Sequence, residues 1–204
     1  MMCMPEAVTL EQVHQVATRL FAGLGYDMTT LDLVADALGV PTATVVELTG
    51  GKRELYLQVI NRGCEEKYAA VRAALAEAEP GRDAVHRFTD AYLDFYAEHP
   101  DFLALWTHRW VSDASDVPEI EDLYLRPLLR LAAPKIRSAV PDDIGPYGLL
   151  GIVLWCVSGF LNTGILAPGG RGMIKADDPD AMKFFRDILH IVIDRMLAPP
   201  QPHT

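Results

Sequence analysis

The sequence predicts an all-α protein with about nine helices. Three observations support this fold class. Apolar residues recur at spacings of three and four along most of the chain, capping residues and glycines bracket these runs, and no segment alternates convincingly as a strand would. The 204 residues are half apolar, which excludes intrinsic disorder and allows a core without disulfide or metal support.

Three short helices are expected in the first fifty residues. The first runs from Val8 to Leu24, begins at a capping box formed by Thr9 and Gln12, and ends at Gly25. Thr29 or Thr30 caps the second, which Gly39 ends, and the third covers about 42–48 between Pro41 and the Gly50-Gly51 pair. A helix, a tight turn at 38–40 and a further helix predict a helix-turn-helix.

The remaining helices are longer and are separated by proline, glycine and polar stretches. Pro127 and Pro134 are expected to kink or interrupt the helix that contains them. A loop rich in Gly, Pro and Asp is expected at 167–179. The predicted helices cover 52–79, 83–98, 101–111, 119–140, the uncharged segment that starts near 145, and 180–197.

The uncharged segment has two interpretations. No charged residue occurs from Ile144 to Gly170, and residues 149–166 are long enough to span a membrane. Polar residues dilute the apolar run, five glycines between Gly145 and Gly164 lower its helix propensity, and no cluster of cations flanks it. A buried helix at a subunit interface is therefore favoured over a membrane span, and a charge introduced at Val153 or Val157 is expected to disrupt that interface.

The sequence gives little sign of catalysis or metal binding. Cys3, Cys64 and Cys156 are far apart, so neither a disulfide framework nor a zinc site is expected. His190 and Asp194 lie one helical turn apart, which is typical of an exposed helix pair. We predict no catalytic residue, no metal, no cofactor and no enzyme activity. The first residues lack the pattern of a secretory signal, and a cytoplasmic protein is expected.

The first fifty-six residues contain a recognisable family pattern. It lies in the segment ATRLFAGLGYDMTTLDLVADALGV, followed by GKRELYLQVI. The positions that carry it are Ala17, Leu20, Phe21, Gly25, Tyr26, Thr29, Thr30, Val34, Ala35, Gly39, Val40, Thr44, Lys52, Leu55 and Tyr56. In these positions the chain resembles the tetracycline-repressor (TetR) family of transcriptional regulators. The resemblance implies a DNA-binding head (residues 1–51) and a helical body (residues 52–204). Such a body binds a small effector and forms a homodimer, here through residues 146–166 and 180–197.

The third helix departs from the family pattern. The family usually has Ser or Thr at position 41, an apolar residue and Tyr at 45–46, and His-Phe at 48–49. This chain has Pro41, Val45, Val46, Leu48 and Thr49. Lys52 is the phosphate contact that remains, with Thr30 as a helper, and the first turn of the helix is expected to read bases. The candidate DNA-binding residues are Thr30, Thr42, Ala43, Thr44, Val46 and Lys52.

Charge leaves two functions open for the head. Residues 1–51 hold one basic residue, Arg19, and six acidic ones, whereas phosphate binding depends on cations. The first hypothesis is a ligand-responsive regulator, expected to be a repressor, that binds operator DNA as a homodimer. The alternative is a TetR-like protein that binds small molecules or proteins and has lost DNA binding.

Aromatic residues gather in the middle of the body. Several have spacings of three, four or seven, so they can face one interior, and aromatic walls suit a small apolar or aromatic effector. The same pattern is also typical of an ordinary core. The candidate effector contacts are Tyr68, Tyr92, Phe95, Phe102, Trp106, Trp110, Tyr124 and Trp155.

Overall fold

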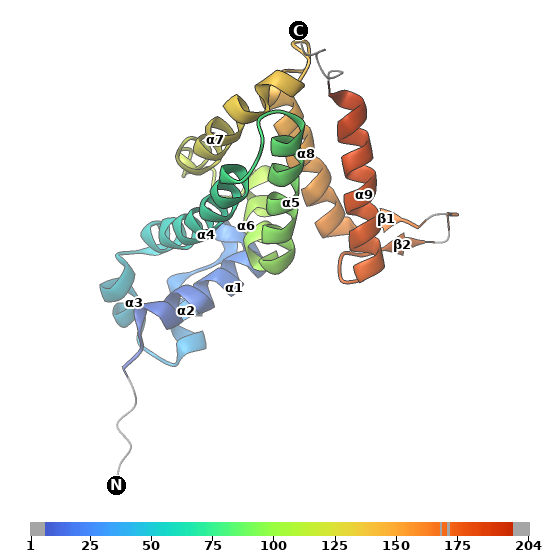
Figure 1. The fold of residues 1–204 in the computed structure, drawn as a ribbon. Coiled ribbons are helices and arrows are strands. Elements are labelled where there is room, and N and C mark those ends of the chain that lie inside the picture. The colour runs from blue at the N-terminus through green and yellow to red at the C-terminus, as the bar shows by residue number, and fades with distance from the viewer. Residues whose placement is uncertain (1–6, 168, 171, 198–204) are drawn as a thin grey trace. The chain divides into compact units, whose positions relative to one another are not determined.

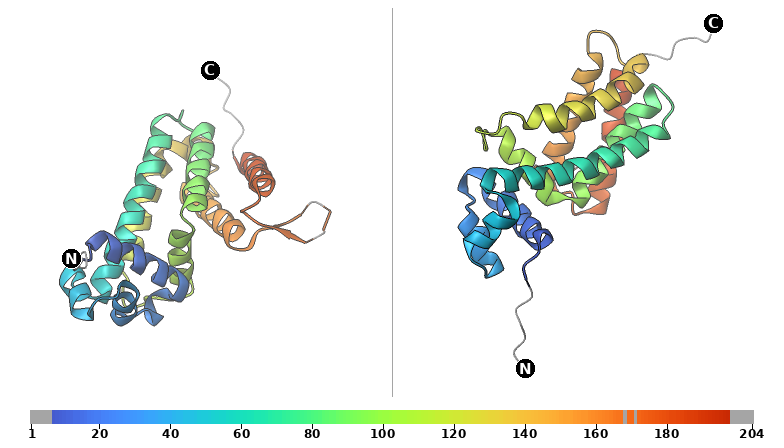
Figure 2. Two further views of the ribbon diagram at one scale, coloured as in Figure 1. Left: turned by 90° about the horizontal axis from the view of Figure 1, so that it is seen from below. Right: turned by 90° about the vertical axis from the view of Figure 1, so that its left-hand side faces the viewer.

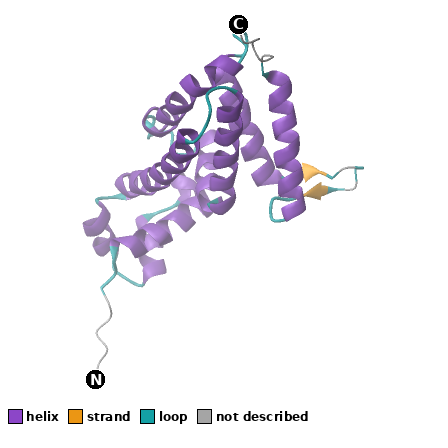
Figure 3. Ribbon diagram, in the orientation of Figure 1, coloured by secondary structure: helices purple, strands orange, loops and turns teal. Residues whose placement is uncertain are grey.

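A computed structural model of the chain describes residues 7–167, 169–170 and 172–197, and it is almost entirely helical (Figures 1 and 3). This confirms the predicted all-α fold with nine helices among the described residues. The α-helices are α1 (Leu10–Met28), α2 (Leu31–Leu38), α3 (Thr42–Thr49), α4 (Lys52–Ala76), α5 (Arg82–Glu98), α6 (Pro100–Trp110), α7 (Arg126–Ile136), α8 (Gly145–Thr163) and α9 (Pro179–Met196).

The helix predicted at 119–140 is divided into three pieces. A π-helical turn, η1 (Glu121–Leu125), precedes α7, and a 3-10 turn, η2 (Arg137–Ala139), follows it. Pro127 lies in the first turn of α7, where its missing N–H costs little. Pro134 lies inside α7, and the α-helix ends two residues later.

A small antiparallel ladder lies between α8 and α9, where the uncharged helix was expected to end at residue 166 and a loop to follow at 167–179. Strand β1 (Ile165–Leu166) pairs with β2 (Met173–Ile174) (Figure 2). Ile165 lies opposite Ile174. Gly164 has a φ of 82° and ends α8, and a Cβ at this position would lie 2.3 Å from the carbonyl oxygen of Ile174. Strands of two residues are too short to produce an alternating sequence pattern.

The chain divides into two compact units. The first contains residues up to Glu65 together with 99–120, and the second contains 66–98 and the residues from 121 onward. Helix α6 packs against α1 within the first unit. The functional division into a head of residues 1–51 and a body of residues 52–204 stays a prediction. The Nε2 atom of His108 lies 2.9 Å from the carbonyl oxygen of Ala22.

Capping residues set the beginnings of α1 and α2. The predicted capping box of Thr9 and Gln12 is present at α1. Thr30 caps α2 by accepting a hydrogen bond from the amide of Leu33 at 3.2 Å, while the hydroxyl of Thr29 donates to the carbonyl of Gly25. Of the two predicted caps, Thr30 is therefore the one that serves α2.

Gly25 forms a kink within α1, although a helix end was predicted there. Its φ of 78° and ψ of 170° interrupt the helix, which continues to Met28. The carboxylate of Asp113, in the loop after α6, accepts from the amides of Tyr26 at 2.6 Å and Asp27 at 2.9 Å. Asp113 therefore satisfies the amides that the kink releases.

An aromatic cluster forms the core of the first unit. The rings of Phe21 and Tyr56 have centroids 5.0 Å apart, and those of Tyr26 and Tyr56 are 4.7 Å apart. All three side chains are buried. Burial of this much aromatic surface stabilises α1 against the first part of α4.

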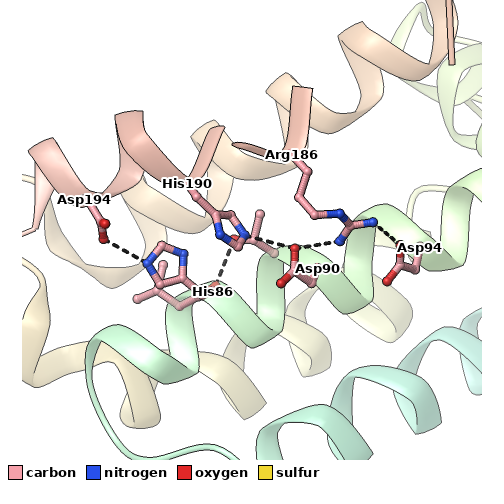
Figure 4. A network of polar contacts seen from close by, with 8 residues as sticks. His86, Asp90, Asp94, Arg186, His190 and Asp194 are labelled. Carbon is pink, nitrogen blue, oxygen red and sulfur yellow. Dashed lines mark hydrogen bonds and ion pairs between the residues drawn. The ribbon is translucent and has the colours of Figure 1, made fainter. Parts of the chain in front are cut away.

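In the second unit, a row of polar contacts joins α5 to α9 (Figure 4). The Nε2 atom of His86 lies 2.8 Å from a carboxylate oxygen of Asp194, and Nε2 of His190 lies 2.9 Å from Asp90. Each histidine therefore pairs with an aspartate on the other helix. The predicted exposed pair of His190 and Asp194 is not formed, because both side chains reach across to α5.

Arginines complete the row at both ends. Arg186 of α9 donates to Asp90 at 2.7 Å and also contacts Asp94, while Arg82 of α5 contacts Asp194. Burial alone would lower the pKa of Arg186, but its two aspartates raise it above the ordinary value. These ion pairs fix the register between α5 and α9.

Candidate DNA-binding face and effector-binding body

Helix α3 presents a largely uncharged outer face. Val45 and Thr49 are buried against the rest of the first unit, whereas Ala43, Val46 and Glu47 are exposed. Pro41 precedes the helix and provides no side-chain capping bond. The outer face of α3 can therefore contact base edges through apolar groups, but Glu47 is its charged group and would repel phosphate.

The threonines predicted to contact DNA also have structural contacts. The Thr42 hydroxyl donates to the Asp32 carboxylate at 2.6 Å, which ties the first turn of α3 to α2. The Thr30 hydroxyl accepts from the α2 backbone, so its own hydrogen remains able to donate. Thr44 is half-buried within α3.

Lys52 is held at the first residue of α4. Its Nζ atom donates to the carbonyl of Asp27 at 3.1 Å and lies 4.4 Å from the centroid of the Tyr26 ring. The ammonium group therefore stabilises the carbonyl end of α1, where the helix dipole is negative. Burial and the neighbouring Asp116 raise the pKa of Tyr26, so the ring that lies under Lys52 stays neutral.

The other cations near this face have acidic or carbonyl partners. Arg53 contacts the carboxylate of Glu119, and Arg19 donates to the carbonyl of Gln15 at 3.3 Å. The net charge of residues 1–56 is −4. Phosphate binding by this face would therefore depend mainly on Lys52 and on backbone amides at helix N-termini.

The eight aromatic residues proposed for the effector do not share one environment. Tyr92, Phe95, Phe102 and Trp106 are buried, and Tyr68 and Tyr124 are half-buried. Trp110 is 41% exposed and Trp155 is 73% exposed.

Trp155 does not lie in the interior of the body, contrary to the sequence interpretation. Helix α8 buries one face, which includes Val153 and Val157, and Trp155 projects from the opposite face. Aromatic residues counted along the sequence cannot be assigned to one interior without knowing which helix face is covered.

The aromatic residues of α5 form a connected row in the second unit. The centroid of Tyr92 lies 5.8 Å from that of Phe88 and 4.9 Å from that of Tyr96, and Phe95 lies 5.3 Å from Tyr96. On α6, in the first unit, the Phe102 ring packs so closely on α4 that a Cβ added to Gly63 would lie 2.4 Å from it.

Sequence reasoning missed a buried lysine beside this row. Lys67 is 1% exposed, and its Nζ atom donates to the hydroxyl of Tyr96 at 3.0 Å. The sequence interpretation placed Tyr68 on the inner face of α4, but Tyr68 is only half-buried. The spacing of the sequence could have identified Lys67 as buried. It belongs to a series of buried residues four positions apart, which comprises Leu55, Val59, Gly63, Lys67, Val71 and Leu75.

The outer faces of α8 and α9 are apolar. Large exposed side chains occur on α8 at Tyr147, Ile152 and Trp155, and on α9 at Ile188, Ile191 and Val192. By length and composition alone, α8 is long and apolar enough to cross a membrane. In the structure, 44% of its apolar 18-residue stretch is buried inside the protein. Val153 and Val157, where an introduced charge was expected to disrupt the interface, are buried within the protomer. A charge at either position would disturb the packing of the protomer itself, so it cannot test a dimer interface separately.

Neither metal binding nor disulfide formation is supported by the described side chains. Neither Cys64 nor Cys156 forms a disulfide within the described part of the chain, and Cys3 lies outside the described residues. Burial raises the pKa of the Cys156 thiol, which makes it less reactive. Among the residues that the structure describes, no three His, Cys, Asp or Glu side chains are placed to hold a metal ion.

Comparison with known proteins gives regulators as relatives. No protein-family model matches the sequence. The uncharacterized HTH-type transcriptional regulator YhgD of Bacillus subtilis is 25% identical over 128 residues, which are 63% of this chain and 67% of YhgD. The HTH-type transcriptional activator FasR of Mycolicibacterium smegmatis is 30% identical over 84 residues, 41% of this chain and 38% of FasR.

The fold comparison extends over almost the whole chain. The crystal structure of the TetR family transcriptional regulator PfmR from Thermus thermophilus matches with a TM-score of 0.64 at 20% identity, covering 96% of this chain and 100% of PfmR. This finding agrees with the motifs of the first fifty-six residues. The chain therefore has the fold of TetR-family structures, as the resemblance of its first fifty-six residues implied.

Proposed function

We propose that this protein is a cytoplasmic, ligand-responsive transcriptional regulator that binds operator DNA as a homodimer and has no enzymatic activity. The observation that carries the proposal is the geometry of the helix-turn-helix. Helix α3 follows α2 after a left-handed Gly39, exposes Ala43 and Val46, and is followed directly by Lys52 at the start of α4. An exposed helix beside a positioned cation is what base readout combined with phosphate anchoring requires.

The second half of the proposal is a homodimer formed by α8 and α9. Their exposed apolar side chains and the absence of any charge on α8 support a self-complementary contact between two copies. Glycines on α8, among them Gly148 and Gly159, are exposed and would let a partner helix approach closely. A dimer would place two heads on successive turns of the major groove, about 34 Å apart.

The third part is release by an effector. The buried aromatic row of α5 supports a body that accepts an apolar or aromatic molecule. An effector that binds one arrangement of the body more tightly than the other would change the population able to hold DNA. Repression and activation both follow from this scheme, according to where the operator lies relative to the promoter.

A salt-graded DNA-binding assay with the protein's own upstream region tests the first part. We expect binding that strengthens steeply as salt falls, and Lys52→Ala should weaken all sequences alike and reduce the salt slope by about one charge. The matched control is Lys183→Ala, which removes an exposed cation of α9 far from α3 in the sequence. Absence of binding even at low salt would contradict the DNA-binding role and favour a protein that has lost it.

A gain-of-function variant asks whether the missing family side chains limit DNA affinity. Both Val46 and Leu48 are exposed, so Val46→Tyr with Leu48→His should be tolerated and should tighten binding. If the double variant folds and gives no tighter binding, Glu47→Gln asks whether acidity is the limiting property.

Sedimentation of a surface variant tests the dimer. We expect Trp155→Glu with Ile152→Glu to convert the dimer to a monomer, because two charges would be buried at the interface. Leu123→Glu, at an exposed apolar residue of η1, is the control and should leave the dimer intact. A wild-type protein that sediments as a monomer, or is recovered only in detergent, would overturn this part.

A further inference from the structure

The residue types of α3 exclude one kind of base readout. Residues 42–49 are Thr-Ala-Thr-Val-Val-Glu-Leu-Thr, with no Arg, Lys, Asn or Gln among them. Arginine and lysine bind the O6 and N7 acceptors of guanine, and asparagine and glutamine bind the N7 and N6 groups of adenine. Helix α3 therefore lacks the side chains that form bidentate contacts with purines.

The geometry of α3 defines what its outer face presents instead. Val45 and Thr49 are buried against the rest of the first unit. Ala43, Val46 and Glu47 are exposed, and their spacings of three and four residues place them on one face of the helix. This face carries methyl groups and one carboxylate.

The threonine hydroxyls of α3 are mostly engaged within the protein. Thr42 donates to the Asp32 carboxylate at 2.6 Å, and Thr49 donates to the carbonyl of Val45 at 2.8 Å. Because a hydroxyl has one hydrogen, neither can donate to a base edge without losing that contact. Thr44 is half-buried, and a threonine hydroxyl can pair with any base, so it adds little discrimination.

Methyl groups and a carboxylate complement the pyrimidine edges of the major groove. Thymine projects its C5-methyl group there, and cytosine presents the N4 amino donor. Ala43 and Val46 can pack on a thymine methyl group, and Glu47 can accept from a cytosine amino group. Guanine presents two acceptors, which would repel the Glu47 carboxylate.

We propose that α3 reads pyrimidines, with Ala43 and Val46 contacting thymine methyl groups and Glu47 accepting from a cytosine amino group. This inference rests on the proposed function and deepens it, because it names the bases that the operator presents to α3. It also gives Glu47 a role in choosing the sequence. The carboxylate weakens binding to all DNA through phosphate repulsion and restores affinity only where a cytosine faces it.

Replacement of thymine by uracil tests the methyl contacts. The upstream fragment is amplified once with dTTP and once with dUTP, which gives the same base pairs with and without the C5-methyl groups. We expect the thymine duplex to bind about tenfold or more tightly, since each buried methyl group contributes about a factor of four. Val46→Ala, which removes two methyl groups and favours the helix, should lower this ratio by about threefold or more.

A control variant separates methyl contacts from effects on the DNA itself. Leu24→Ala removes an exposed apolar side chain of α1, and we expect it to keep the wild-type ratio. A thymine preference that survives unchanged in Val46→Ala would come from the shape of the duplex, and it would overturn the methyl contact.

Selection from duplexes of randomised sequence tests Glu47. We expect wild-type protein to select cytosine at one position of each half-site, and Glu47→Gln to shift that position toward adenine, which glutamine can bind through N7 and N6. Asp36→Asn removes an exposed carboxylate of α2 and should leave the selected sequence unchanged. If Glu47→Gln binds more tightly but selects the same bases, Glu47 acts through its charge alone and its assignment is overturned.

The outcomes separate this inference from the proposed function. Circular dichroism of each variant establishes that the fold is intact. If the thymine and uracil duplexes bind equally well to the wild-type protein, the pyrimidine readout is overturned while DNA binding stands. If neither duplex binds even at low salt, the DNA-binding role fails and the readout fails with it.

Discussion

Lys52 and Lys67 occupy the same helix, and each lies beside a tyrosine ring and an oxygen acceptor. Lys52, at the first residue of α4, contacts the Asp27 carbonyl and the Tyr26 ring and remains half-exposed. Lys67, in the middle of α4, contacts the hydroxyl and ring of Tyr96 and is 1% exposed. Both ammonium groups contact a tyrosine ring and an oxygen atom, but their exposure to water differs greatly.

The difference in exposure separates two uses of one side chain. At Lys52 water still solvates the charge, so the cation costs little to hold and is available to phosphate. At Lys67 water is excluded, so the charge depends on the protein groups that surround it. The first lysine can reach a macromolecular polyanion at the surface, whereas the second cannot.

The largest expected effect tests the helix that carries both lysines. In Gly63→Val the added atoms would meet the Phe102 ring, since even a Cβ would lie 2.4 Å from it. We expect the free energy of unfolding to fall by about 3 kcal/mol, measured by urea denaturation. Gly23→Ala in α1 is the control: nothing lies within 4 Å of its Cβ, and it should stabilise by about 0.5–1 kcal/mol. Equal effects of the two substitutions would contradict the close contact on α4.

The second-largest expected effect on the unfolding free energy concerns Asp113, which binds the backbone next to Lys52. Asp113 accepts from the amides of Tyr26 and Asp27, the residues that Lys52 contacts. Asp113→Ala leaves both amides without this acceptor, and we expect a loss of about 2 kcal/mol in unfolding free energy. Asp116→Ala removes a longer bond to the Tyr26 hydroxyl, at 3.3 Å, and should cost less than about 1 kcal/mol. A reversed order would show that the kink does not depend on Asp113.

Replacing Lys52 by methionine gives a smaller effect. Lys52→Met removes a cation from the carbonyl end of α1 and should lower the unfolding free energy by about 0.5 kcal/mol, measured by chemical denaturation. Lys183→Met, which removes an exposed cation of α9, is the control and should change the unfolding free energy less. An equal or larger effect of Lys183→Met would contradict the stabilising role of Lys52.

The smallest expected effect concerns Asp194, a half-buried carboxylate of α9. Burial alone would raise the pKa of Asp194, but the hydrogen bond from His86 and the charge of Arg82 lower it below its ordinary value. A carboxylate with a depressed folded-state pKa contributes stability above its ordinary pKa of 3.8, and that contribution is lost as pH falls through the lowered value. Asp194→Asn should therefore show a shallower acid-side loss of thermal stability than wild type. Parallel profiles for the two proteins would contradict this.

The sequence by itself determined the features that depend on neighbours within one helical turn. The capping box at Thr9, the left-handed end of α2 at Gly39 and the helical segments follow from contacts between residues three or four positions apart. The uncharged character of α8 and the acidity of the head are properties of composition. These features could be read before any tertiary structure was known.

Only the tertiary structure decided the environment of individual side chains. Lys67 meets Tyr96 across 29 positions, and His86 meets Asp194 across 108, so no local pattern could pair them. Gly25 became a kink because Asp113, far along the chain, accepts the amides it releases. Trp155 faces outward because α8 packs by its other face. Helical periodicity gives the angle between side chains on one helix, whereas the burial of a face depends on which other helix covers it.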